Sequence, residues 1–243
     1  MTDKVIIIPS RLKATRLPNK PLKKINNKEM ILHVYDAAKD ANIGEVIVAS
    51  PDEQILELVK SYKAVSVKTS FDHKTGTDRI FEVFDKFLKQ KPKFIINLQG
   101  DMPNIDPNAI KSLSEYISKN VCDIATLSSK FIHEDELNDV NKVKVLTKNP
   151  LKDKSFENVI DFNRSGEIKK NEYAYHHIGI YAFTKEALIR YVGLKRTKKE
   201  IERNLEQLRA LENNMKINVG YTSSTPLSID TEEDLINIKN LMK

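Results

Sequence analysis

The chain has 243 residues, of which 40% are hydrophobic and 30% are charged, and its formal net charge is +6. This length and composition indicate a globular protein with one large α/β domain or two small ones, and no apolar stretch is long enough to span a bilayer. Cys122 is the only cysteine, which excludes a disulfide framework and a cysteine metal cluster. Because the first residues also lack a signal-peptide pattern, we expect a cytoplasmic location.

The positive charge is scattered along the chain. Lys residues alternate with Glu and Asp in the predicted helices, and the sequence has neither a long basic block nor a platform of aromatic residues. We therefore expect no nucleic-acid partner. A basic nucleic-acid-binding module stays open as the least favoured alternative, and salt-dependent retention on DNA would be its mark.

Hydrophobic periodicity predicts alternating strands and helices. The predicted strands are 5–8, 45–49, 64–69, 94–98, 123–128, 141–146, 159–162, 176–183 and 217–221. The predicted helices are 27–42 (closed by Gly44), 52–62, 77–90 (with Thr77 as N-cap), 106–120, 198–213 and one that follows Asp230. This spacing predicts βαβ units. We therefore expect a Rossmann-like α/β fold with a mostly parallel central sheet, helices on both faces and an inserted antiparallel portion at about 129–191.

Positively charged side chains follow the first predicted strand, which is a β-branched run that ends at Pro9. Four cations lie within the next short segment: Arg11, Lys13, Arg16 and Lys20. Ligands of open α/β sheets bind beyond the carboxyl ends of the strands, and Arg and Lys bind phosphate oxygens. The segment therefore predicts a polyphosphate site, although it carries neither a P-loop nor a dinucleotide-binding glycine motif. A solvated basic loop is the alternative.

Two carboxylates occupy positions where a metal ligand would be needed. Asp101 comes directly after the buried strand 94–98, where a Mg²⁺ ion on a nucleoside triphosphate would bind. Asp230 precedes the last predicted helix. Each has an ordinary structural alternative, which is a turn residue for Asp101 and a helix cap for Asp230.

The segment that includes Pro9-Ser10-Arg11 and Arg16-Leu-Pro-Asn-Lys-Pro-Leu22 resembles the opening loop of sugar nucleotidyltransferases. It is most similar to the cytidylyltransferases that activate acidic sugars such as 3-deoxy-manno-octulosonate (Kdo). Further strings resemble motifs of this family in the expected order: Asp72-His-x-x-Gly-Thr-Asp-Arg79, Gln99-Gly-Asp101, Asn141-x-Val-Lys-Val145, His177-x-Gly-Ile-Tyr181, Leu205-Glu-Gln-Leu-Arg209 and Asp230-Thr-x-Glu-Asp-Leu235.

The resemblance implies transfer of CMP from CTP to the anomeric hydroxyl of Kdo, with release of pyrophosphate and formation of CMP-Kdo for lipopolysaccharide synthesis. It implies Mg²⁺ as the cofactor, held by Asp101 and Asp230. The implied catalytic residues are Arg11, Lys20, Asp101 and Asp230. The implied nucleotide-binding residues are Arg11, Thr15, Arg16, Lys20, Ser70, Gly76, Thr77 and Gln99. The implied sugar-binding residues are Gln99, Arg164, His177, Tyr181, Glu206 and Gln207.

The resemblance also implies a single nucleotidyltransferase domain in three parts. Residues 1–128 would bind CTP, residues 129–191 would bind the sugar and form a dimer, and residues 192–243 would supply closing helices and the second metal carboxylate. The homodimer rests on the resemblance alone.

Two departures from the family pattern affect the choice of sugar. Met102 stands where the family has Glu in Gln-Gly-Asp-Glu-Pro, and the loop 165–172 after Arg164 is short. The alternatives are therefore a cytidylyltransferase for another acidic sugar, such as 8-amino-Kdo or a nonulosonic acid, and a non-catalytic nucleotide-binding protein. His73 and His176 receive no role. Because neighbouring strand residues point to opposite faces, His176 and His177 do not predict a shared metal site.

Overall fold

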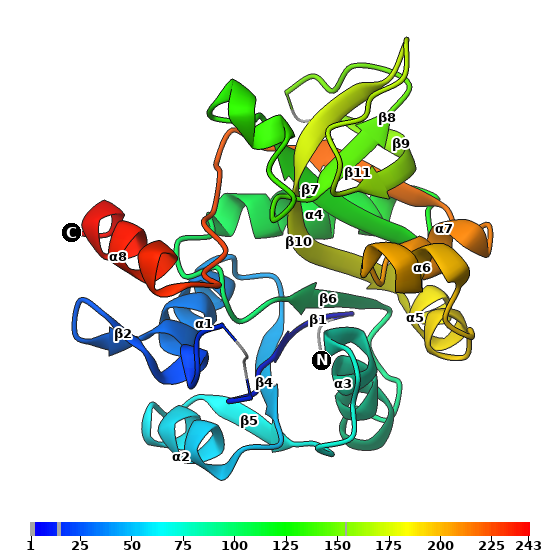
Figure 1. Cartoon of the computed structure of the whole chain (residues 1–243). Coiled ribbons are helices and arrows are strands. Elements are labelled where there is room, and N and C mark those ends of the chain that lie inside the picture. The colour runs from blue at the N-terminus through cyan, green and yellow to red at the C-terminus, as the bar shows by residue number, and fades with distance from the viewer. Residues whose placement is uncertain (1–2, 14–15, 154) are drawn as a thin grey trace.

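A nine-stranded sheet covered by helices on both faces forms the body of the protein (Figure 1). The structure is a computed structural model that describes residues 3–13, 16–153 and 155–243. In order across the sheet, the strands are β5 (Val65–Lys68), β4 (Glu45–Ser50), β1 (Lys4–Pro9), β6 (Phe94–Leu98), β10 (Tyr173–Thr184), β7 (Ile124–Ser129), β11 (Ile217–Tyr221), β9 (Phe156–Asn163) and β8 (Lys144–Thr147).

The helices are α1 (Met30–Asp40), α2 (Glu53–Ser61), α3 (Gly76–Glu82), α4 (Pro107–Lys119), α5 (Lys185–Val192), α6 (Lys198–Arg203), α7 (Leu208–Glu212) and α8 (Glu232–Leu241). Short helical segments are η1 (Lys20–Leu22), η2 (Val83–Phe87) and η3 (Glu134–Leu137). Buried residues of α1, α2 and α4 pack on one face of the sheet, and those of α3, α5 and α7 on the other. None of the helices in the described part of the chain combines the length and apolarity needed to cross a membrane.

Two halves of the sheet have different geometry. Strands β5, β4, β1 and β6 pair in parallel, whereas β10 enters the middle of the sheet antiparallel to both β6 and β7. Because β8 also pairs with the first part of β10, the five strands β10, β7, β11, β9 and β8 form a closed ring of pairings. The predicted α/β class is confirmed, and the antiparallel strands β9 and β10 lie in the portion expected at 129–191.

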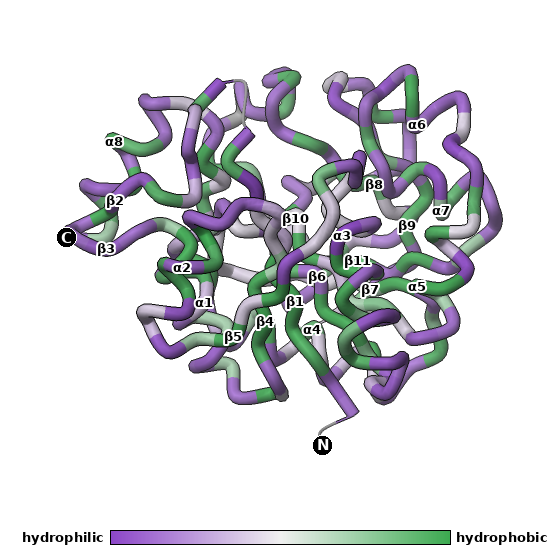
Figure 2. Tube along the Cα trace, turned by 90° about the horizontal axis from the view of Figure 1, so that it is seen from below, coloured by the Kyte–Doolittle hydropathy of each residue, from purple (hydrophilic) through white to green (hydrophobic). Residues whose placement is uncertain are grey.

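The buried strand β1 shows why the sheet is covered on both sides. Ile6 and Ile8 pack into the core on one face, and Val5 and Ile7 into the core on the other, all with 0 or 1% exposure. A continuous β-branched run suits this environment, because side chains of alternating residues point to opposite faces. Figure 2 shows the same concentration of hydrophobic residues along β1, β4 and β6.

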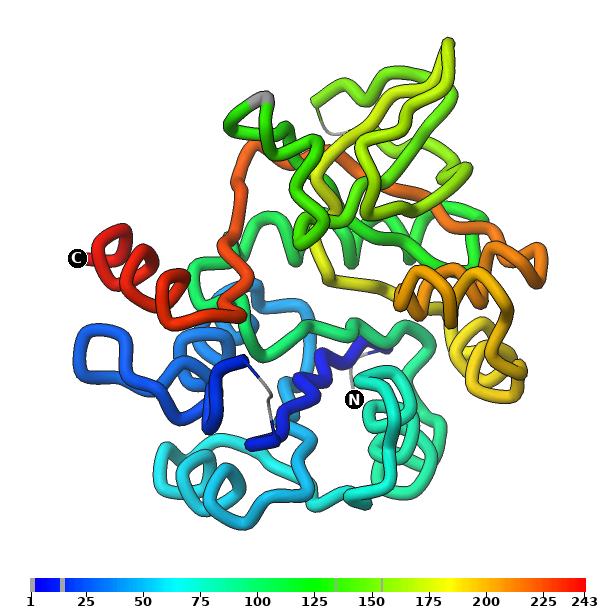
Figure 3. Tube along the Cα trace, viewed as in Figure 1, coloured from blue at the N-terminus to red at the C-terminus, as the bar shows by residue number. Residues whose placement is uncertain are grey.

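The two ends of the chain meet in a third, smaller core. Helix α8 packs against the hairpin of β2 (Lys24–Ile25) and β3 (Lys28–Glu29) (Figure 3). Its buried residues Leu235 and Ile238 lie in one cluster with Leu17 and Ile25. This contact brings the segment before α8 to the loop that follows β1.

Two predicted helix ends are wrong because asparagines take the left-handed conformation. Asn26 and Asn27, with φ of 48° and 69°, form the two-residue turn of the β2–β3 hairpin, so α1 begins at Met30 and not at residue 27. Asn42, with φ of 50°, follows the last turn of α1. It therefore ends the helix in place of the predicted Gly44.

The predicted helix 198–213 is two helices. Asn204 has φ of 52° and ends α6, and α7 begins only at Leu208. A buried bidentate pair between Arg209 and Glu200, with distances of 2.6 and 2.9 Å, joins the two helices across the break. The break leaves Glu206 and Gln207 in the connection between the helices. Helix α5 was not predicted.

Candidate active site

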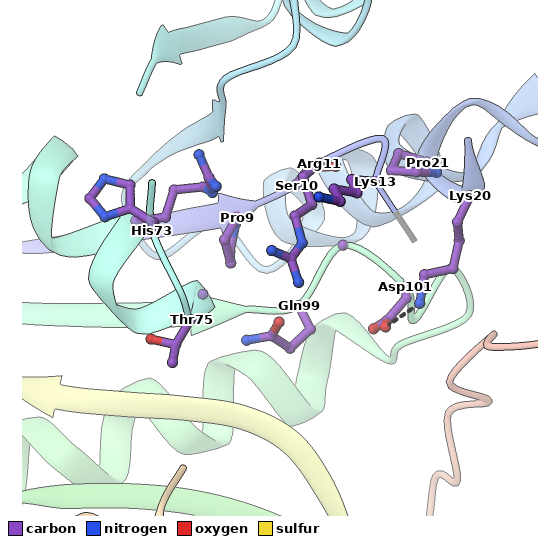
Figure 4. Close-up of a pocket in the computed structure, with 13 residues that line it drawn as sticks. Pro9, Ser10, Arg11, Lys13, Lys20, Pro21, His73, Thr75, Gln99 and Asp101 are labelled. Atoms are coloured by element: carbon purple, nitrogen blue, oxygen red, sulfur yellow. Dashed lines mark hydrogen bonds and ion pairs between the residues drawn. The ribbon is translucent and has the colours of Figure 1, made fainter. Parts of the chain in front are cut away.

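A cavity of about 290 Å³ opens beyond the carboxyl ends of β1 and β6 (Figure 4). Its walls come from the loop after β1, the loop before α3 and the residues after β6. The charged side chains that line it include one carboxylate, Asp101, and four Arg or Lys side chains: Arg11, Lys13, Lys20 and Arg79. Such an excess of positive charge favours an anionic ligand with several oxygens.

Hydrogen bonds hold the start of the loop after β1 in place, while its basic side chains remain accessible. The backbone N–H of Leu12 donates to Asp52 at 2.8 Å, and the N–H of Asn19 donates to the carbonyl of Leu12 at 3.3 Å. Arg11 and Lys13 are exposed, and in Figure 4 the Arg11 side chain extends from the loop toward Gln99. The predicted nucleotide-binding residue Thr15 lies outside the described residues.

Lys20 joins the two predicted metal carboxylates. Its Nζ lies 2.8 Å from Asp101 Oδ2 and 3.1 Å from Asp230 Oδ1. Burial acts to lower the pKa of Lys20, but attraction and hydrogen bonds to both carboxylates raise the pKa above its usual value. Lys20 is therefore protonated at the edge of the cavity. Lys20 holds the two carboxylates together, although they are 129 positions apart in the sequence.

Arg16 contacts Asp230 from the solvent side, with Nη2 and Oδ2 2.8 Å apart. Both side chains are about half exposed, at 55% and 42%. A pair this exposed contributes only about 0–1 kcal/mol to stability. Its main effect is to orient the carboxylate of Asp230.

The backbone explains how Asp101 and Asp230 meet. The N–H of Ile229 donates to the carbonyl of Asp101 at 3.0 Å, so the segment before α8 runs along the loop after β6. The N-cap of α8 is Thr231, which forms a capping box with Asp234. Because Thr231 caps the helix, the carboxylate of Asp230 is free to face Lys20, and the helix-cap alternative for Asp230 is wrong.

The loop before α3 brings backbone close to the cavity. Thr75, and not Thr77, is the N-cap of α3, again in a capping box with Asp78. A Cβ atom at Gly76 would lie 3.2 Å from Pro9 Cγ and 3.4 Å from Gln99. Any larger residue at position 76 would therefore be crowded by Pro9 and Gln99, and glycine avoids this contact. Thr77, a predicted nucleotide-binding residue, is 1% exposed and does not line the cavity.

Glu82 organises the tip of the same loop. Its carboxylate accepts a hydrogen bond from the N–H of Ser70 at 2.8 Å and contacts His73 Nε2 at 2.6 Å. Burial acts to raise the pKa of Glu82, but hydrogen bonds from His73, Ser70 and Lys86 lower it to about 2. Ser70 therefore supports the loop through its backbone, while His73 also lines the cavity.

Arg79 is a cavity residue to which the sequence gave no role. Its guanidinium is 3% exposed and donates to Thr69 Oγ1 at 2.5 Å and to the carbonyl of Ser70 at 2.9 Å. No ion pair to Arg79 occurs within the described chain, and burial together with nearby Arg11 lowers its pKa. A charged residue beside Ile80 in the buried stripe of a helix is the signal that could have revealed it.

Several predicted sugar-binding residues gather beside the cavity as a buried group. His177 is 7% exposed, and its Nε2 lies 2.9 Å from Thr126 Oγ1. Burial lowers the pKa of His177 to about 3, so the ring is neutral. Its ring centroid lies 5.5 Å from that of Tyr181, which is 6% exposed. Burial and the nearby Glu206 raise the pKa of Tyr181.

Glu206 and Gln207 extend this buried group. Glu206 accepts a hydrogen bond from Thr77 at 3.1 Å, and its Oε2 is buried without a hydrogen-bond partner among the described residues. Burial raises the pKa of Glu206, although the hydroxyls of Thr77 and Thr75 act to lower it. Gln207 is 6% exposed. Neither residue lines the 290 Å³ cavity, whereas Gln99 does.

Arg164 lies apart from that group, directly after β9 and next to the loop before β8. Its Nη1 donates to the carbonyl of Val140 at 3.0 Å. Next to it the Lys144 ammonium, 0% exposed, donates to the carbonyls of Asp139, Lys142 and Arg164 at 2.6, 2.9 and 3.0 Å. Each of the three N–H groups of the Lys144 ammonium thus has a carbonyl oxygen as its acceptor. Burial lowers the pKa of Lys144.

Met102 has an apolar position. It is 2% exposed and packs in the hydrophobic core on the face of α1 and α4. Met102 is thus part of the core, and it adds no carboxylate beside Asp101.

The donor set at the cavity edge suits a hard cation. Asp101 and Asp230 face one ammonium, and their oxygens are the ligands that Mg²⁺ prefers. Within the described part of the chain no third His, Cys, Asp or Glu joins them. Mg²⁺ commonly binds one or two carboxylates together with water and substrate phosphates, so two carboxylates beside a cationic cavity fit.

A mixed α/β sheet with this cavity at the carboxyl ends of its parallel strands β1 and β6 defines the protein as a nucleotidyltransferase-fold protein. 4-Diphosphocytidyl-2C-methyl-D-erythritol synthase from Anaerococcus prevotii shares the fold, with a TM-score of 0.65 at 16% identity, covering 99% of this chain and 98% of that one. The sequence profile of the cytidylyltransferase family matches residues 5–217, and the chain belongs to this family.

Full-length relatives are known. The 3-deoxy-manno-octulosonate cytidylyltransferase of Bartonella henselae is 39% identical over 99% of this chain and 98% of its own length. That of Thermodesulfovibrio yellowstonii is 41% identical over 95% and 94%. The solved structure of CMP:2-keto-3-deoxy-manno-octonic acid synthetase complexed with CTP superposes with a TM-score of 0.87 at 32% identity, covering 98% of both chains.

Proposed function

We propose that the protein transfers the CMP group of CTP to the anomeric hydroxyl of Kdo, releasing pyrophosphate and forming CMP-Kdo for lipopolysaccharide synthesis. The cationic cavity that ends at the Asp101–Lys20–Asp230 cluster is the observation that carries this proposal. Full-length similarity to relatives named for this activity supports it.

The triphosphate would bind along the loop after β1. Arg11, Lys13 and Lys20 reach the cavity from this loop, and Arg16 lies beside Asp230. Their charges would neutralise the phosphate oxygens and hold the α-phosphate for attack, which is the main task of catalysis in phosphoryl-type transfer. The base would lie against the loop before α3, where Gly76 leaves backbone accessible.

Asp101 and Asp230 would hold Mg²⁺. The bound ion would neutralise phosphate charge and make the attacking hydroxyl more acidic. Lys20 and Arg16 keep both carboxylates turned toward the cavity edge. Cations that already face the carboxylates would also limit their repulsion before the ion binds.

The sugar acid would lie between the cavity and the buried group beside it. Arg164 would pair with the sugar carboxylate, because Arg offers a bidentate fork for such a group. Gln99, His177, Tyr181, Glu206 and Gln207 would hold its hydroxyls. The neutral ring of His177 suits a hydrogen bond to a hydroxyl.

We also propose a cytoplasmic homodimer. Five large hydrophobic side chains among the described residues of the part 129–191 are exposed: Ile132, Val140, Ile168, Tyr173 and Ile189. Such side chains support an interface. Light scattering after size exclusion would give twice the mass of one chain, and a single-chain mass would contradict the dimer.

Pyrophosphate release tests the proposed function. CTP, UTP, ATP and GTP would each be combined with Kdo, 8-amino-Kdo and a sialic acid in the presence of Mg²⁺. We expect release with CTP and Kdo, and its loss in Asp101→Ala. Asp3→Ala is the matched control, since Asp3 pairs with Lys93 on the surface. Release with CTP and a different sugar would show that this sugar, and not Kdo, is the substrate. No release with any pair would overturn the proposed enzyme function.

A further inference from the structure

A chain of buried hydrogen bonds runs from the cavity to Glu206. Gln99 Nε2 donates to Asn97 Oδ1 at 3.0 Å, Asn97 Nδ2 donates to Thr77 Oγ1 at 3.3 Å, and Thr77 Oγ1 donates to Glu206 Oε1 at 3.1 Å. Asn97 and Thr77 are 0% and 1% exposed. Both are polar side chains in the core between β6, α3 and α7, where a polar group without a partner is costly.

The chemistry of its members fixes the direction of every bond in this chain. The Oε1 atom of Glu206 carries no proton when the group is ionised, so it accepts from the Thr77 hydroxyl. The Thr77 oxygen must then accept from the NH₂ group of Asn97. Asn97 therefore turns its carbonyl oxygen toward Gln99 and accepts from the NH₂ group of that residue.

The opposite amide orientation is unfavourable. If Asn97 were flipped, its carbonyl oxygen would face Thr77 and would compete with Glu206 for the single hydroxyl proton. One buried acceptor would lose its donor, which costs more than the bond itself contributes. In the favourable orientation the carbonyl oxygen of Gln99 is left for a ligand in the cavity.

We propose that Asn97 and Thr77 are positioning residues that fix the orientation of Gln99 relative to Glu206, so that Gln99 presents its carbonyl oxygen to a hydroxyl group of the bound substrates. The inference rests on the proposed function for the identity of those substrates. It assigns a role to two buried residues that do not line the cavity, and it connects the nucleotide and sugar sides of the site through the core.

Thr77→Val and Thr77→Ser test the proposal as a pair. Valine keeps the shape of threonine but removes the hydroxyl, whereas serine keeps the hydroxyl. Thr147→Val is the matched control, because Thr147 is also 0% exposed and its hydroxyl donates to the carbonyl of Asn149 at 2.7 Å, in β8. We expect kcat/KM for Kdo to fall about tenfold in Thr77→Val, a loss typical of one buried hydrogen bond. Thr77→Ser should stay within about threefold of wild type, and Thr147→Val should match wild type.

Two readouts separate positioning from a general loss of stability. Loss of the Thr77 donor should raise the pKa of Glu206, so the acid limb of the kcat/KM profile should move to higher pH in Thr77→Val only. The side-chain NH₂ signals of Asn97 and Gln99 in ¹⁵N-labelled protein should both shift in Thr77→Val and stay in place in Thr77→Ser and Thr147→Val.

An unchanged Gln99 signal in Thr77→Val, or equal kinetics in Thr77→Val and Thr147→Val, would overturn the proposal. The NMR experiment needs no turnover. If the wild-type protein released no pyrophosphate with any substrate pair, the proposed function would fail, and the Gln99 signal would still decide whether Thr77 sets the orientation of this amide.

Discussion

The two halves of the sheet place polar side chains in opposite ways. In the parallel half, most polar groups of the cavity lie on the loops after β1, before α3 and after β6, and Arg11 and Lys13 are exposed charges. In the ring of β10, β7, β11, β9 and β8 the polar groups project from within strands. There His177 and Lys144 are 7% and 0% exposed.

This difference follows from strand geometry. A loop beyond a strand end leaves charged groups in water until an anionic ligand replaces the water, whereas a strand residue inside a closed ring is buried and must find its partners within the protein. Loop charges suit binding of phosphates. Strand-borne groups, such as the neutral His177, suit a site with a fixed pattern of hydrogen bonds.

Lys20→Met should have the largest effect in the parallel half. The variant leaves Asp101 and Asp230 without the cation that they share and removes one phosphate partner. We expect kcat for pyrophosphate release to fall about 100- to 1,000-fold, as for the loss of a preorganised electrostatic group. Lys23→Met is the control, since Lys23 pairs with Glu232 only at 3.8 Å on the surface. A loss below about fivefold in Lys20→Met would contradict the role of this cluster.

Lys144→Met tests the ring. The variant leaves three carbonyls without their donor and loosens the loop that carries Arg164. We expect KM for Kdo to rise about tenfold and KM for CTP to change little, because the variant disturbs the proposed sugar site and leaves the proposed nucleotide site intact. Lys152→Met, on an exposed turn, should leave both constants unchanged. Equal increases in both KM values would contradict the assignment of CTP to one half of the sheet and of Kdo to the other.

Gly220→Ala examines packing within the ring. A Cβ atom here would lie 2.4–2.7 Å from ring atoms of Phe156, which stacks on Tyr116 at 3.7 Å. Overpacking of this kind costs about 1–3 kcal/mol of unfolding free energy. Gly193→Ala, whose nearest atom is the Arg190 carbonyl at 3.5 Å, should be close to neutral. Urea unfolding of both variants would check the contrast, and equal midpoints would refute it.

Glu82→Gln should have the smallest effect, and it depends on pH. The folded pKa of Glu82 is lowered to about 2 from a usual value of 4.5. Its ionised form therefore stabilises the fold above pH 4.5, and this contribution is lost as the pH falls toward 2. At pH 6 we expect a larger unfolding free energy for the wild type than for Glu82→Gln, measured by urea unfolding. The difference between the two proteins should shrink as the pH falls below 4.5. A difference that stays constant across this range would exclude the linkage.

The sequence determined the parts of the protein that depend on local pattern. The β-branched run of β1 predicted a strand buried on both faces, and the cations from Arg11 to Lys20 predicted an anion site at its end. Asp101 followed from its place after β6. Local sequence can predict such features because each depends on neighbours in the chain, through the alternation of apolar residues, the density of charge and the position of strand ends.

Tertiary structure decided the rest. Only the packing of α8 on the amino-terminal hairpin brings Asp230 to Lys20, and only the core reveals that Thr77 and Asn97 connect Gln99 with Glu206. The helix break at Asn204 was not predicted either, because asparagine is tolerated in both helical and left-handed conformations. Contacts between residues far apart in the chain leave no periodic signal, and they arise only when burial forces each polar group to find a partner.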